Sequence, residues 1–541
     1  MTDWIGYKWL EEAYGVASVQ RLRTESRIAK SRATETVDGY VRETYTTAVR
    51  PQDTLAGHLT FALKHEGVHL EFLARLFAVL PKAELEAWVR AEPNGLYAHR
   101  AGFFYEWLTH DTLDFQGVTG GAYVNALDEQ RYFTATQASN IPRWRVRDNL
   151  PGTRDYCPIV LRTPGVVQAA ELDISAQMQQ LEAEFGVELP MRSAVWLTNK
   201  ESRASFAIER ETRFVDRIKR FAAVMASRCG HYANPLDESA TADLQREILG
   251  PNATRYGMRQ SPVFVGESDH YTQVVHYIGP HWDDAPSMLR GLRAFEDRTR
   301  GQASVVRAAV LSFGFVYIHP MVDGNGRISR FLINDTLRRD GVLPEPFILP
   351  VSATITRSAT NRRGYDQVLE SFSKPLMARY ADQYRFGHEV KGADGVTYNL
   401  EFDGYADAAL AWRYPDLTDH VEYLGVVVQD TLQHEMRKEA NFLRQLRAAR
   451  EAVKNLLDGP DADIDRIIRS VREHGTVSNK LKSEFSMLAD EVLAGQVVEV
   501  IASAFEWGGL GAQRRTLVWK GFLQVELAPA EDAVALEWLR A

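Results

Sequence analysis

Hydrophobic residues along this chain recur mostly at helical spacing. Leu55 to Leu80 forms one apolar seam that ends at Pro81, and a second long seam runs from Leu417 to Leu457. The stretch from Ser304 to His319 is apolar almost all round, which is typical of a buried helix. The pattern therefore predicts a mainly α-helical protein whose most buried helix lies within this last stretch.

Departures from helical spacing divide the chain further. Residues 257–266 and 273–280 are β-prone runs separated by a polar turn, and they predict a hairpin. We predict four parts: a helical N-terminal region (1–90), a mixed irregular region (91–190), a central domain (191–385) and a largely helical C-terminal domain (386–541). In the last part, residues 472–479 fit the turn of a helix-turn-helix, and a protein-binding or dimerisation module fits at least as well.

Composition narrows the class of protein. The chain has 541 residues, 45% of them hydrophobic and 25% charged, as in a globular protein with several domains. A formal charge of −9 argues against nonspecific nucleic-acid binding as the main function. Two cysteines, Cys157 and Cys229, are too few for a disulfide framework, and the start of the chain lacks a signal-peptide pattern. No apolar run is long enough to span a membrane, so we expect a cytoplasmic protein.

A short loop after the apolar helix carries the most informative residues. Pro320 ends the helix, and Asp323-Gly324-Asn325-Gly326 leads into a second helix. Gly324 and Gly326 let the backbone come close to a ligand, and the free N–H groups at the start of the second helix favour negative charge. The arrangement predicts an anion site, most naturally for phosphate groups.

Charged side chains around this loop extend the chemistry. Arg327 and Arg330 are permanent cations suited to phosphate oxygens. Asp323 supplies the hard carboxylate oxygen that Mg²⁺ prefers when it binds together with a nucleotide. His319, at the entrance of the loop, can accept a proton near neutral pH. These residues predict transfer of a phosphorus-containing group to a protic acceptor.

The stretch from His319 to Arg330, HPMVDGNGRISR, resembles the signature of Fic-domain proteins, His-Pro-Phe-x-(Asp/Glu)-Gly-Asn-Gly-Arg-x-x-Arg. Eight specified positions match, and Met321 replaces the usual Phe as a flexible core filler. The resemblance implies a central Fic-type helical bundle with a β-hairpin flap, and the activity of an AMP transferase that uses ATP. The Doc-like branch, which uses ATP as a phosphate donor, carries Lys at the position of Gly326.

The same resemblance implies a role for each residue of the loop. His319 deprotonates a Ser, Thr or Tyr hydroxyl of a target protein, which attacks the α-phosphate of ATP and releases pyrophosphate. Asp323 binds Mg²⁺, Asn325 with the loop amides holds the α-phosphate, and the two arginines hold the outer phosphates. The implied nucleotide-binding residues of the loop are Gly324, Asn325, Gly326, Arg327 and Arg330.

A second resemblance concerns regulation. Ser205-Phe-Ala-Ile-Glu209 is similar to the inhibitory helix of Fic proteins, (Ser/Thr)-x-x-x-Glu-(Gly/Asn), with Arg210 at the last position. Ser31-Arg-Ala-Thr-Glu35 fits the motif equally well, but the neighbours of Glu209 and its position 110 residues before the loop histidine favour Glu209. Its carboxylate would pair with Arg330 and remove a cation that the γ-phosphate needs, so we expect autoinhibition in cis. An ordinary exposed helical glutamate is the alternative.

Further residues are implied at the nucleotide pocket. The predicted hairpin is similar to the Fic flap, which binds the target backbone as an added strand, and its Val265 and Gly266 would edge the pocket. Tyr365, in Arg362-Arg-Gly-Tyr365, resembles the tyrosine that lies against the adenine. Asp366 occupies the position of a second tyrosine, so the aromatic contact is incomplete.

One motif points to different chemistry. His65-Glu66-Gly67-Val68-His69 matches H-E-x-x-H, in which two histidines on one helix face bind zinc and the glutamate acts as a base. Glu84 or Glu86 would have to serve as the third ligand. The alternative is the flank of an ordinary helix that contains a glycine.

These observations favour a protein AMP transferase that is restrained in cis, with ATP and Mg²⁺ as its cofactors and self-modification compatible with the sequence. A phosphotransferase or an AMP-removing hydrolase remains open, as does a nucleotide-responsive regulator that binds DNA or protein. A zinc peptidase is the remote alternative. The sequence is also compatible with a homo-oligomer.

Overall fold

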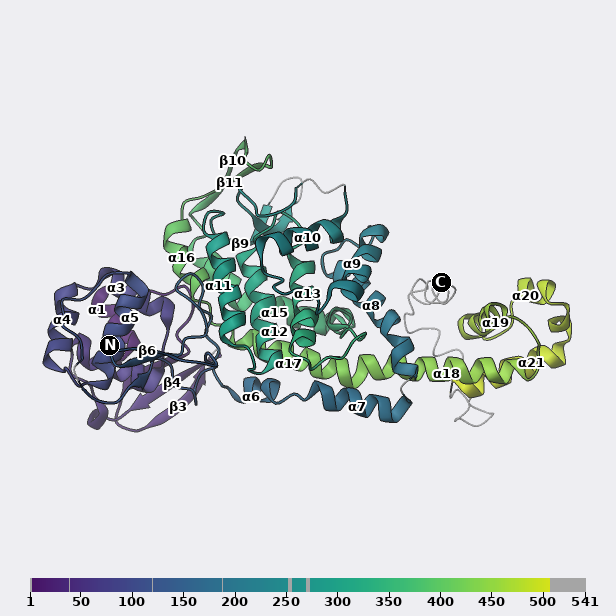
Figure 1. Cartoon of the computed structure of the whole chain (residues 1–541), viewed down its shortest axis with the longest axis horizontal. Coiled ribbons are helices and arrows are strands. Elements are labelled where there is room, and N and C mark those ends of the chain that lie inside the picture. Colours follow the sequence, from purple (N-terminus) through teal and green to yellow (C-terminus); the bar gives the residue numbers. More distant parts are fainter. Residues whose placement is uncertain are drawn as a thin grey trace. The chain divides into compact units, whose positions relative to one another are not determined.

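The computed structural model describes residues 2–37, 39–118, 120–186, 188–251, 255–268 and 273–505. It is mostly helical with small sheets, which confirms the predicted fold class (Figure 1). A larger compact unit combines residues 1–174, 201–345 and 351–430, and a smaller one combines 175–200, 346–350 and the chain from 431 onward. The four-part division stays a prediction, and residues 506–541 of its last part lie outside the described residues.

The N-terminal region contains a sheet that the sequence analysis missed. Its strands are β1 (Trp4–Ile5), β2 (Thr24–Ile28), β3 (Ala33–Val37) and β4 (Tyr40–Tyr45), in the order β1-β2-β4-β3. The prediction of a helical region over residues 1–90 is therefore wrong for residues 24–45. These short strands mix β-branched and charged residues, so they present no long apolar period to read.

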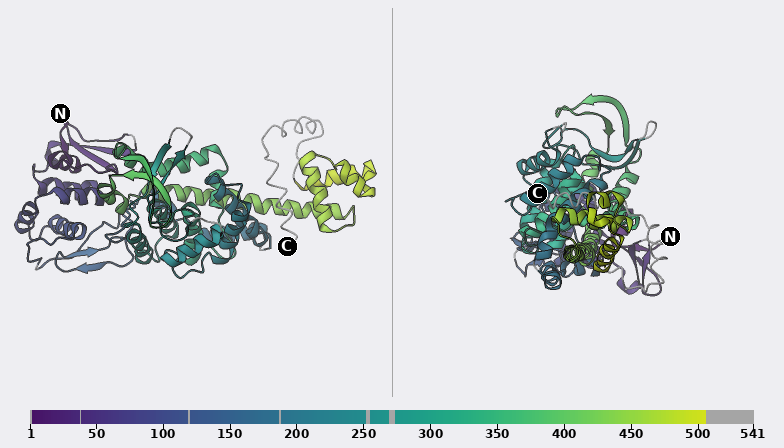
Figure 2. Two further views of the ribbon diagram at one scale, coloured as in Figure 1. Left: turned by 90° about the horizontal axis from the view of Figure 1, so that it is seen from above. Right: turned by 90° about the vertical axis from the view of Figure 1, so that its right-hand side faces the viewer.

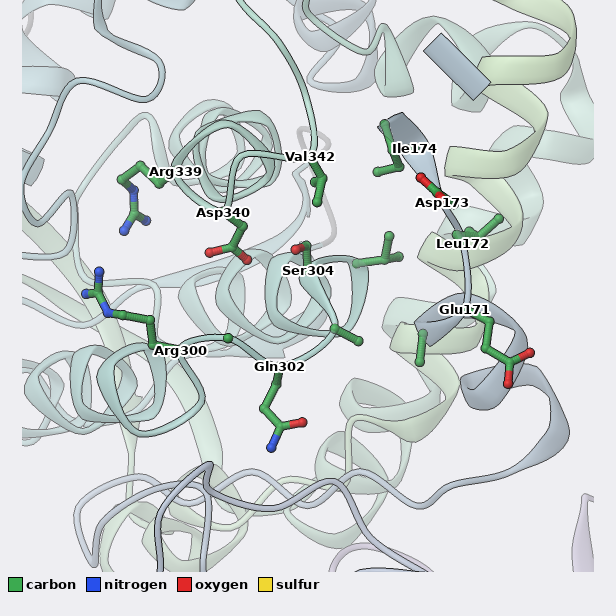
Figure 3. A pocket seen from close by; sticks show the side chains of 14 residues that line it. Glu171, Leu172, Asp173, Ile174, Arg300, Gln302, Ser304, Arg339, Asp340 and Val342 are labelled. Carbon is green, nitrogen blue, oxygen red and sulfur yellow. The ribbon is translucent and has the colours of Figure 1, made fainter. Parts of the chain in front are cut away.

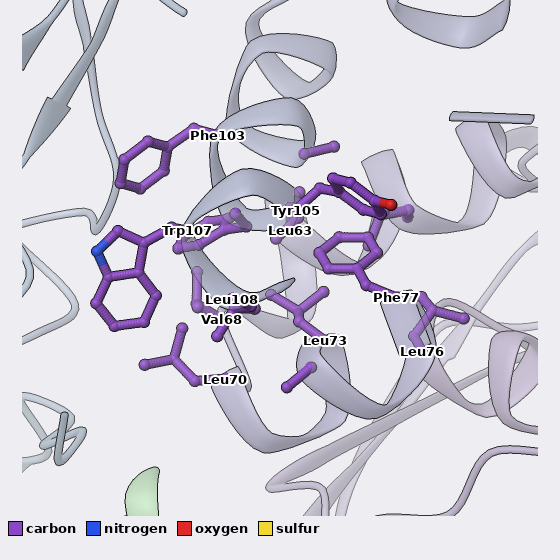
Figure 4. Packing of buried hydrophobic residues seen from close by; sticks show 14 of the residues in the cluster. Leu63, Val68, Leu70, Leu73, Leu76, Phe77, Phe103, Tyr105, Trp107 and Leu108 are labelled. Atoms are coloured by element: carbon purple, nitrogen blue, oxygen red, sulfur yellow. The ribbon is translucent and has the colours of Figure 1, made fainter. Parts of the chain in front are cut away.

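Helices complete this region around one hydrophobic cluster (Figure 4). The short and π-helical segments are Thr47–Val49 and Ala62–Glu66, and the helices are α1 (Tyr7–Tyr14), α2 (Leu55–Phe61), α3 (Leu70–Val79), α4 (Lys82–Ala91) and α5 (Leu96–Thr109). Leu73 and Phe77 of α3 pack in this cluster with Trp107 of α5. The predicted seam from Leu55 to Leu80 is thus buried, although it belongs to more than one helix.

The H-E-x-x-H motif does not form the predicted zinc geometry. Gly67 has φ of 101° and breaks the helix between the two histidines. His69 caps the start of α3, accepting a hydrogen bond from the backbone N–H of Phe72 at 3.1 Å, whereas His65 packs 4.7 Å from the ring of Phe61. The histidines therefore share no helix face. Within the described ranges no three His, Cys, Asp or Glu side chains are grouped to hold a metal.

Small elements connect this region to the central domain. A three-stranded sheet of β5 (Val124–Asn125), β7 (Val146–Asp148) and β6 (Ser139–Ile141) is followed by α6 (Pro164–Ala170) and α7 (Ile174–Phe185). Trp144 is buried and donates a hydrogen bond from Nε1 to Glu106 at 2.7 Å, so it anchors the loop between β6 and β7 in the fold.

The central domain is built around α12 (Ser304–Ile318), which is buried on nearly every side as predicted. α13 (Asn325–Arg339) packs beside it (Figure 1), and Figure 2 shows the chain from two further sides. The surrounding helices are α8 (Glu188–Ile208), α9 (Val215–Arg228), α10 (Glu238–Leu249), α11 (Ala285–Arg298), α14 (Val351–Thr356) and α15 (Ala359–Arg379). The predicted hairpin is confirmed as antiparallel β8 (Phe264–Ser268) and β9 (Gln273–Ile278).

The C-terminal part begins with a second hairpin, β10 (Tyr384–Lys391) and β11 (Thr397–Phe402), and α16 (Tyr405–Arg413). The predicted helical run from Leu417 is confirmed as α17 (Thr418–Asp430), a π-helical segment (Thr431–Glu435) and α18 (Met436–Lys454). The smaller unit continues with α19 (Asp461–His474), α20 (Asn479–Glu484), a 3₁₀ turn (Ser486–Ala489) and α21 (Glu491–Ala504), which share a core with α18.

The turn between α19 and α20 passes through Gly475 in the left-handed conformation, so residues 472–479 join two helices, and the helix-turn-helix motif stays a prediction. DNA binding through it stays a prediction. None of the helices in the described part of the chain has the length and apolar character needed to cross a membrane.

Candidate active site

The loop between α12 and α13, residues 319–326 and called the motif loop below, is closed by its own side chains. His319 ends α12 with φ of 48°, and Gly324 precedes α13 with φ of 94°. The side chain of Asn325 accepts from the backbone N–H of Met321 at 3.0 Å and donates to its carbonyl at 2.8 Å. Met321 is fully buried, as the sequence predicted for this position. Asn325 thus holds the loop together, and its predicted contact with phosphate stays untested.

Among the described residues, His319 has a hydrogen-bond partner at one of its two ring nitrogens. Its Nδ1 lies 3.0 Å from the carbonyl oxygen of Val316. Because a carbonyl only accepts, Nδ1 carries the proton and Nε2 keeps its lone pair. Loss of hydration, together with the neighbouring Arg259, lowers the pKa of His319 to about 4 against the opposing effects of the Val316 carbonyl, Glu209 and Asp323. The imidazole is therefore neutral at pH 7.

At the start of α13, where the sequence predicts an anion site, the carboxylate of Glu209 lies against Gly326. A Cβ atom added at Gly326 would collide with Oε1 of Glu209. Only glycine leaves room for this approach, and the free N–H groups of a helix N-terminus favour a negative charge there. Glu209 therefore lies against the N-terminal end of α13, and binding of an anionic ligand there stays a prediction.

The same carboxylate binds Arg330, which is the pairing expected from the sequence. Nη2 of Arg330 donates to Oε1 of Glu209 at 2.6 Å, and Nε donates to Oγ of Ser205 at 2.6 Å. Loss of hydration raises the pKa of Glu209, but Arg330, Arg327 and His319 outweigh it and hold this pKa below its ordinary value. The competing Ser31–Glu35 segment instead runs into strand β3, so it forms no helix.

Arg327 has a carboxylate partner that the sequence analysis did not identify. Glu211 accepts from Nη1 of Arg327, and Asp323 accepts from Nη2. The guanidinium also lies 5.0 Å from the ring of Phe206. Arg217 approaches the second oxygen of Asp323 at 3.6 Å. A Glu-x-Glu pattern at residues 209–211 was the available signal, since two carboxylates this close can reach two neighbouring cations.

Arg210 explains why this segment turns sharply. It has φ of 58°, in the left-handed region that glycine and asparagine tolerate best. The family motif carries Gly or Asn here, so the conformation accounts for that preference. The Arg210 side chain is exposed and lies 3.0 Å from Glu267 of β8.

The remaining predicted residues lie around this centre. Val265 is exposed on β8, and the hairpin register shifts between Val265 and Gly266. Tyr365 is buried in α15 with its ring 6.2 Å from that of Tyr423, and burial raises its pKa while Arg330 lowers it. The contact of Tyr365 with adenine stays a prediction.

Asp366 replaces the expected second tyrosine and accepts from Nε of Arg362 at 3.2 Å. Arg362 also donates to the carbonyl oxygen of Ile208 at 3.0 Å, which satisfies the last residue of α8. The position thus supports the end of the helix that carries Ser205.

A separate cavity of about 730 Å³ lies at the start of α12, and no predicted site residue lines it (Figure 3). Its lining includes Ser304, Arg339 and Asp340. Arg339 donates to Asp335 at 2.7 Å and Asp340 binds Arg307, so charges at its edge are already paired.

Comparison with known proteins identifies the region that carries this site. The Fic/DOC family model matches residues 235–337. The chain is 40% identical over 114 residues to the protein adenylyltransferase Fic of Drosophila willistoni, covering 20% of each chain. It is 31% identical over 112 residues to the protein adenylyltransferase fic-1 of Caenorhabditis briggsae, again over 20% of each chain.

The chain thus spans about a fifth of the length of the curated relatives it matches. A crystal structure of a Fic family protein from Desulfovibrio desulfuricans G20 aligns with a TM-score of 0.36 and 17% identity, over 55% of this chain and 82% of that one. The matched residues 235–337 include the motif loop and both arginines, Arg327 and Arg330, so the site lies in a domain of the chain that matches the Fic/DOC family.

Proposed function

We propose that this chain transfers AMP from ATP to a hydroxyl side chain of a target protein. One observation carries the proposal: the neutral His319 keeps Nε2 open at the entrance of a loop whose helix start and two arginines suit a polyphosphate. The adenylyltransferase names of the relatives that match the same region support it.

In the proposed reaction, Nε2 of His319 accepts the proton of the target hydroxyl. The hydroxyl oxygen then forms a bond to the α-phosphorus of ATP, and the bond to the β-phosphate breaks, which releases pyrophosphate. The α13 amides stabilise the negative charge that develops on the phosphoryl oxygens. Arg327 and Arg330 bind the departing phosphates, and the bond from Nδ1 to Val316 keeps the imidazole in the correct tautomer.

Asp323 is the residue proposed to hold Mg²⁺. Its side chain is part-exposed, and its main-chain carbonyl is fixed by Nε2 of Gln245 at 2.7 Å. A single carboxylate beside two arginines fits Mg²⁺ only together with nucleotide phosphates, which is the usual mode of binding for this ion. The ion would neutralise phosphate charge. To bind it, Asp323 would give up its ion pairs with Arg327 and Arg217.

The 205–211 segment is proposed to restrain this activity in cis. Glu209 lies against Gly326 of α13 and binds Arg330, and Glu211 binds Arg327 together with Asp323. Both cations that the outer phosphates need are thereby neutralised. ATP would have to displace two carboxylates, so the resting rate should be low.

A labelling experiment tests the function. Self-modification is followed with ATP labelled at the α- or the γ-phosphate, with Mg²⁺ present or chelated, in wild type, Glu209→Gly and His319→Ala. We expect α-label only, dependent on Mg²⁺, strongest in Glu209→Gly and lost in His319→Ala. Transfer of γ-label would instead identify a phosphotransferase.

An AMP-removing hydrolase is the second candidate, because Glu209 and His319 are close enough to shift each other's pKa and could together orient a water. Release of AMP from modified protein by wild type but not by Glu209→Gly would favour it over transfer.

A further inference from the structure

Arg259 is a fully buried cation beside the active site, and it has no ion-pair partner among the described residues. Burial lowers its pKa to about 10, so it stays charged at pH 7. A buried guanidinium without a carboxylate is costly unless its N–H groups are bonded to other acceptors. The Arg259 guanidinium therefore needs acceptors other than a carboxylate, and those acceptors are held in place by it.

All three nitrogens of the guanidinium donate to backbone carbonyl oxygens. Nε donates to His319 at 2.7 Å, Nη1 to Ser261 at 2.9 Å and Nη2 to Pro280 at 2.5 Å. Ser261 precedes β8 and Pro280 follows β9, so these two carbonyls mark the two ends of the flap hairpin. One side chain thus binds both ends of the flap and the residue proposed as the base.

The backbone around Arg259 makes the same connection. Its N–H donates to the carbonyl of Pro320 at 2.9 Å, and Met258 pairs with Met321 of the motif loop in an antiparallel bridge. Gly279, at the end of the flap, leaves room for no side chain between Val263, Arg259 and His319. The loop and the flap are therefore in direct contact at this point.

We propose that Arg259 is a positioning residue that fixes the flap and His319 in one frame, so that a hydroxyl presented along the flap meets Nε2 of His319. This inference rests on the proposed AMP transfer, and it adds a residue outside the motif loop to the machinery of that reaction. Arg259 contacts no reacting atom and acts through the carbonyls it binds.

The left-handed backbone of His319 gives this contact its importance. At φ of 48°, His319 lies in the left-handed region of backbone conformation, which costs free energy for residues other than glycine. Such a conformation persists only where the surrounding contacts fix it. The charged Nε–H of Arg259 provides one such contact by donating to the carbonyl oxygen of His319. Lysine cannot replace it, because a single ammonium lacks the planar fork that reaches three carbonyls.

The test compares two buried arginines at opposite ends of α12. Arg259→Lys keeps the charge, Arg259→Met removes it, and Arg307→Met removes a buried arginine that binds Thr299, Asp340 and the carbonyl of Glu296 far from the flap. Each is made in Glu209→Gly, and self-labelling from α-labelled ATP is measured with thermal unfolding and hydrogen exchange of residues 258–280.

We expect Arg259→Lys to lower kcat by about 100-fold, as for a displaced catalytic group, with the KM for ATP unchanged. The flap amides should exchange faster, while Arg307→Met loses thermal stability but keeps kcat and flap exchange. In Arg259→Met the acid limb of the rate should also move to higher pH than in Arg259→Lys. Both variants lack Glu209 and keep Asp323, so the cation that lowers the pKa of His319 is the charge that differs between them.

Equal loss of kcat in Arg259→Lys and Arg307→Met would overturn the proposal, as would unchanged flap exchange in Arg259→Lys. If Glu209→Gly transfers no AMP, the proposed function fails, and the exchange of residues 258–280 alone decides whether Arg259 holds the flap.

Discussion

The motif loop and the 205–211 segment meet at the same two arginines but are held very differently. In the loop, Met321 and Asn325 are fully buried, and Asn325 bonds twice to the loop backbone. In the segment, Glu209 and Arg210 are exposed, and Glu209 and Glu211 contribute mainly charged contacts. The loop is built as a permanent structure, whereas the end of the segment is attached by contacts that a polyphosphate can replace.

The preceding turns of α8 show where that difference begins. Ser205 and Phe206 are fully buried, and the buried Glu201 accepts from the N–H of Ser352 at 2.7 Å. The helix itself is therefore anchored firmly, and only its last residues are open to competition. Such a division allows the inhibition we propose to be released without unfolding the helix.

The largest expected effect comes from breaking the loop. Replacing Asn325 with alanine removes both bonds to Met321, so we expect AMP transfer in Glu209→Gly to fall by about 100-fold through misplacement of the catalytic groups. Asn334→Ala removes another fully buried asparagine of α13 and serves as the control. The measurement is initial self-labelling rate at saturating ATP, with thermal unfolding of both variants. Equal rates in the two variants would mean that the loop needs no internal closure.

Opening the segment should have the next largest effect, and in the opposite direction. Glu209→Gly removes a charge-assisted hydrogen bond, so we expect the basal rate to rise about 10- to 100-fold. Glu209→Gln keeps the shape of the side chain but not its charge, so its basal rate should lie between those of wild type and Glu209→Gly. The check is the initial rate of labelling with Mg²⁺ and α-labelled ATP. A fall in rate would indicate that Glu209 takes part in the chemistry.

Sequence reasoning identified residues that lie together in the fold where they are also close in the chain. His319, Asp323, the two glycines and the two arginines stand within twelve positions, so their meeting follows from one helix ending and the next beginning. The buried helix around Leu311 was likewise predicted from its apolar positions. The strands of residues 24–45 were missed for the opposite reason, because short polar strands have no distinct hydrophobic period.

The contacts that complete the site escaped for another reason. Glu211 lies 116 residues before Arg327, and Arg259 lies 60 residues before His319. Nothing in the local pattern marks such partners, because the folded chain alone brings them together. The glycine at position 67 was visible in the sequence, but its conformation, with φ of 101°, was not, since Tyr132 packs against it only in the folded chain.

A smaller effect is expected from Glu211. Glu211→Gln weakens the partly exposed pair with Arg327, which should raise the basal rate about 2- to 5-fold. The rise should shrink in Glu209→Gly, because the two carboxylates oppose the same ligand. Glu247→Gln, which breaks the exposed pair with Arg228 elsewhere, is the control. Rates and the KM for ATP distinguish competition from a change in chemistry, and an unchanged KM would contradict the competition.

The smallest and most informative change is at Arg210. Asparagine tolerates the left-handed backbone better than arginine does, so Arg210→Asn should stabilise the turn by about 1 kcal/mol and lower the basal rate a few-fold. Arg210→Ala keeps the strain and loses only the exposed pair with Glu267, which contributes at most about 1 kcal/mol. Thermal unfolding and basal labelling of both variants separate the effect of the backbone strain from that of the ion pair with Glu267. If Asn and Ala raise the rate equally, the pair with the flap outweighs the backbone strain, and the segment is then held by the strand on which the target would dock.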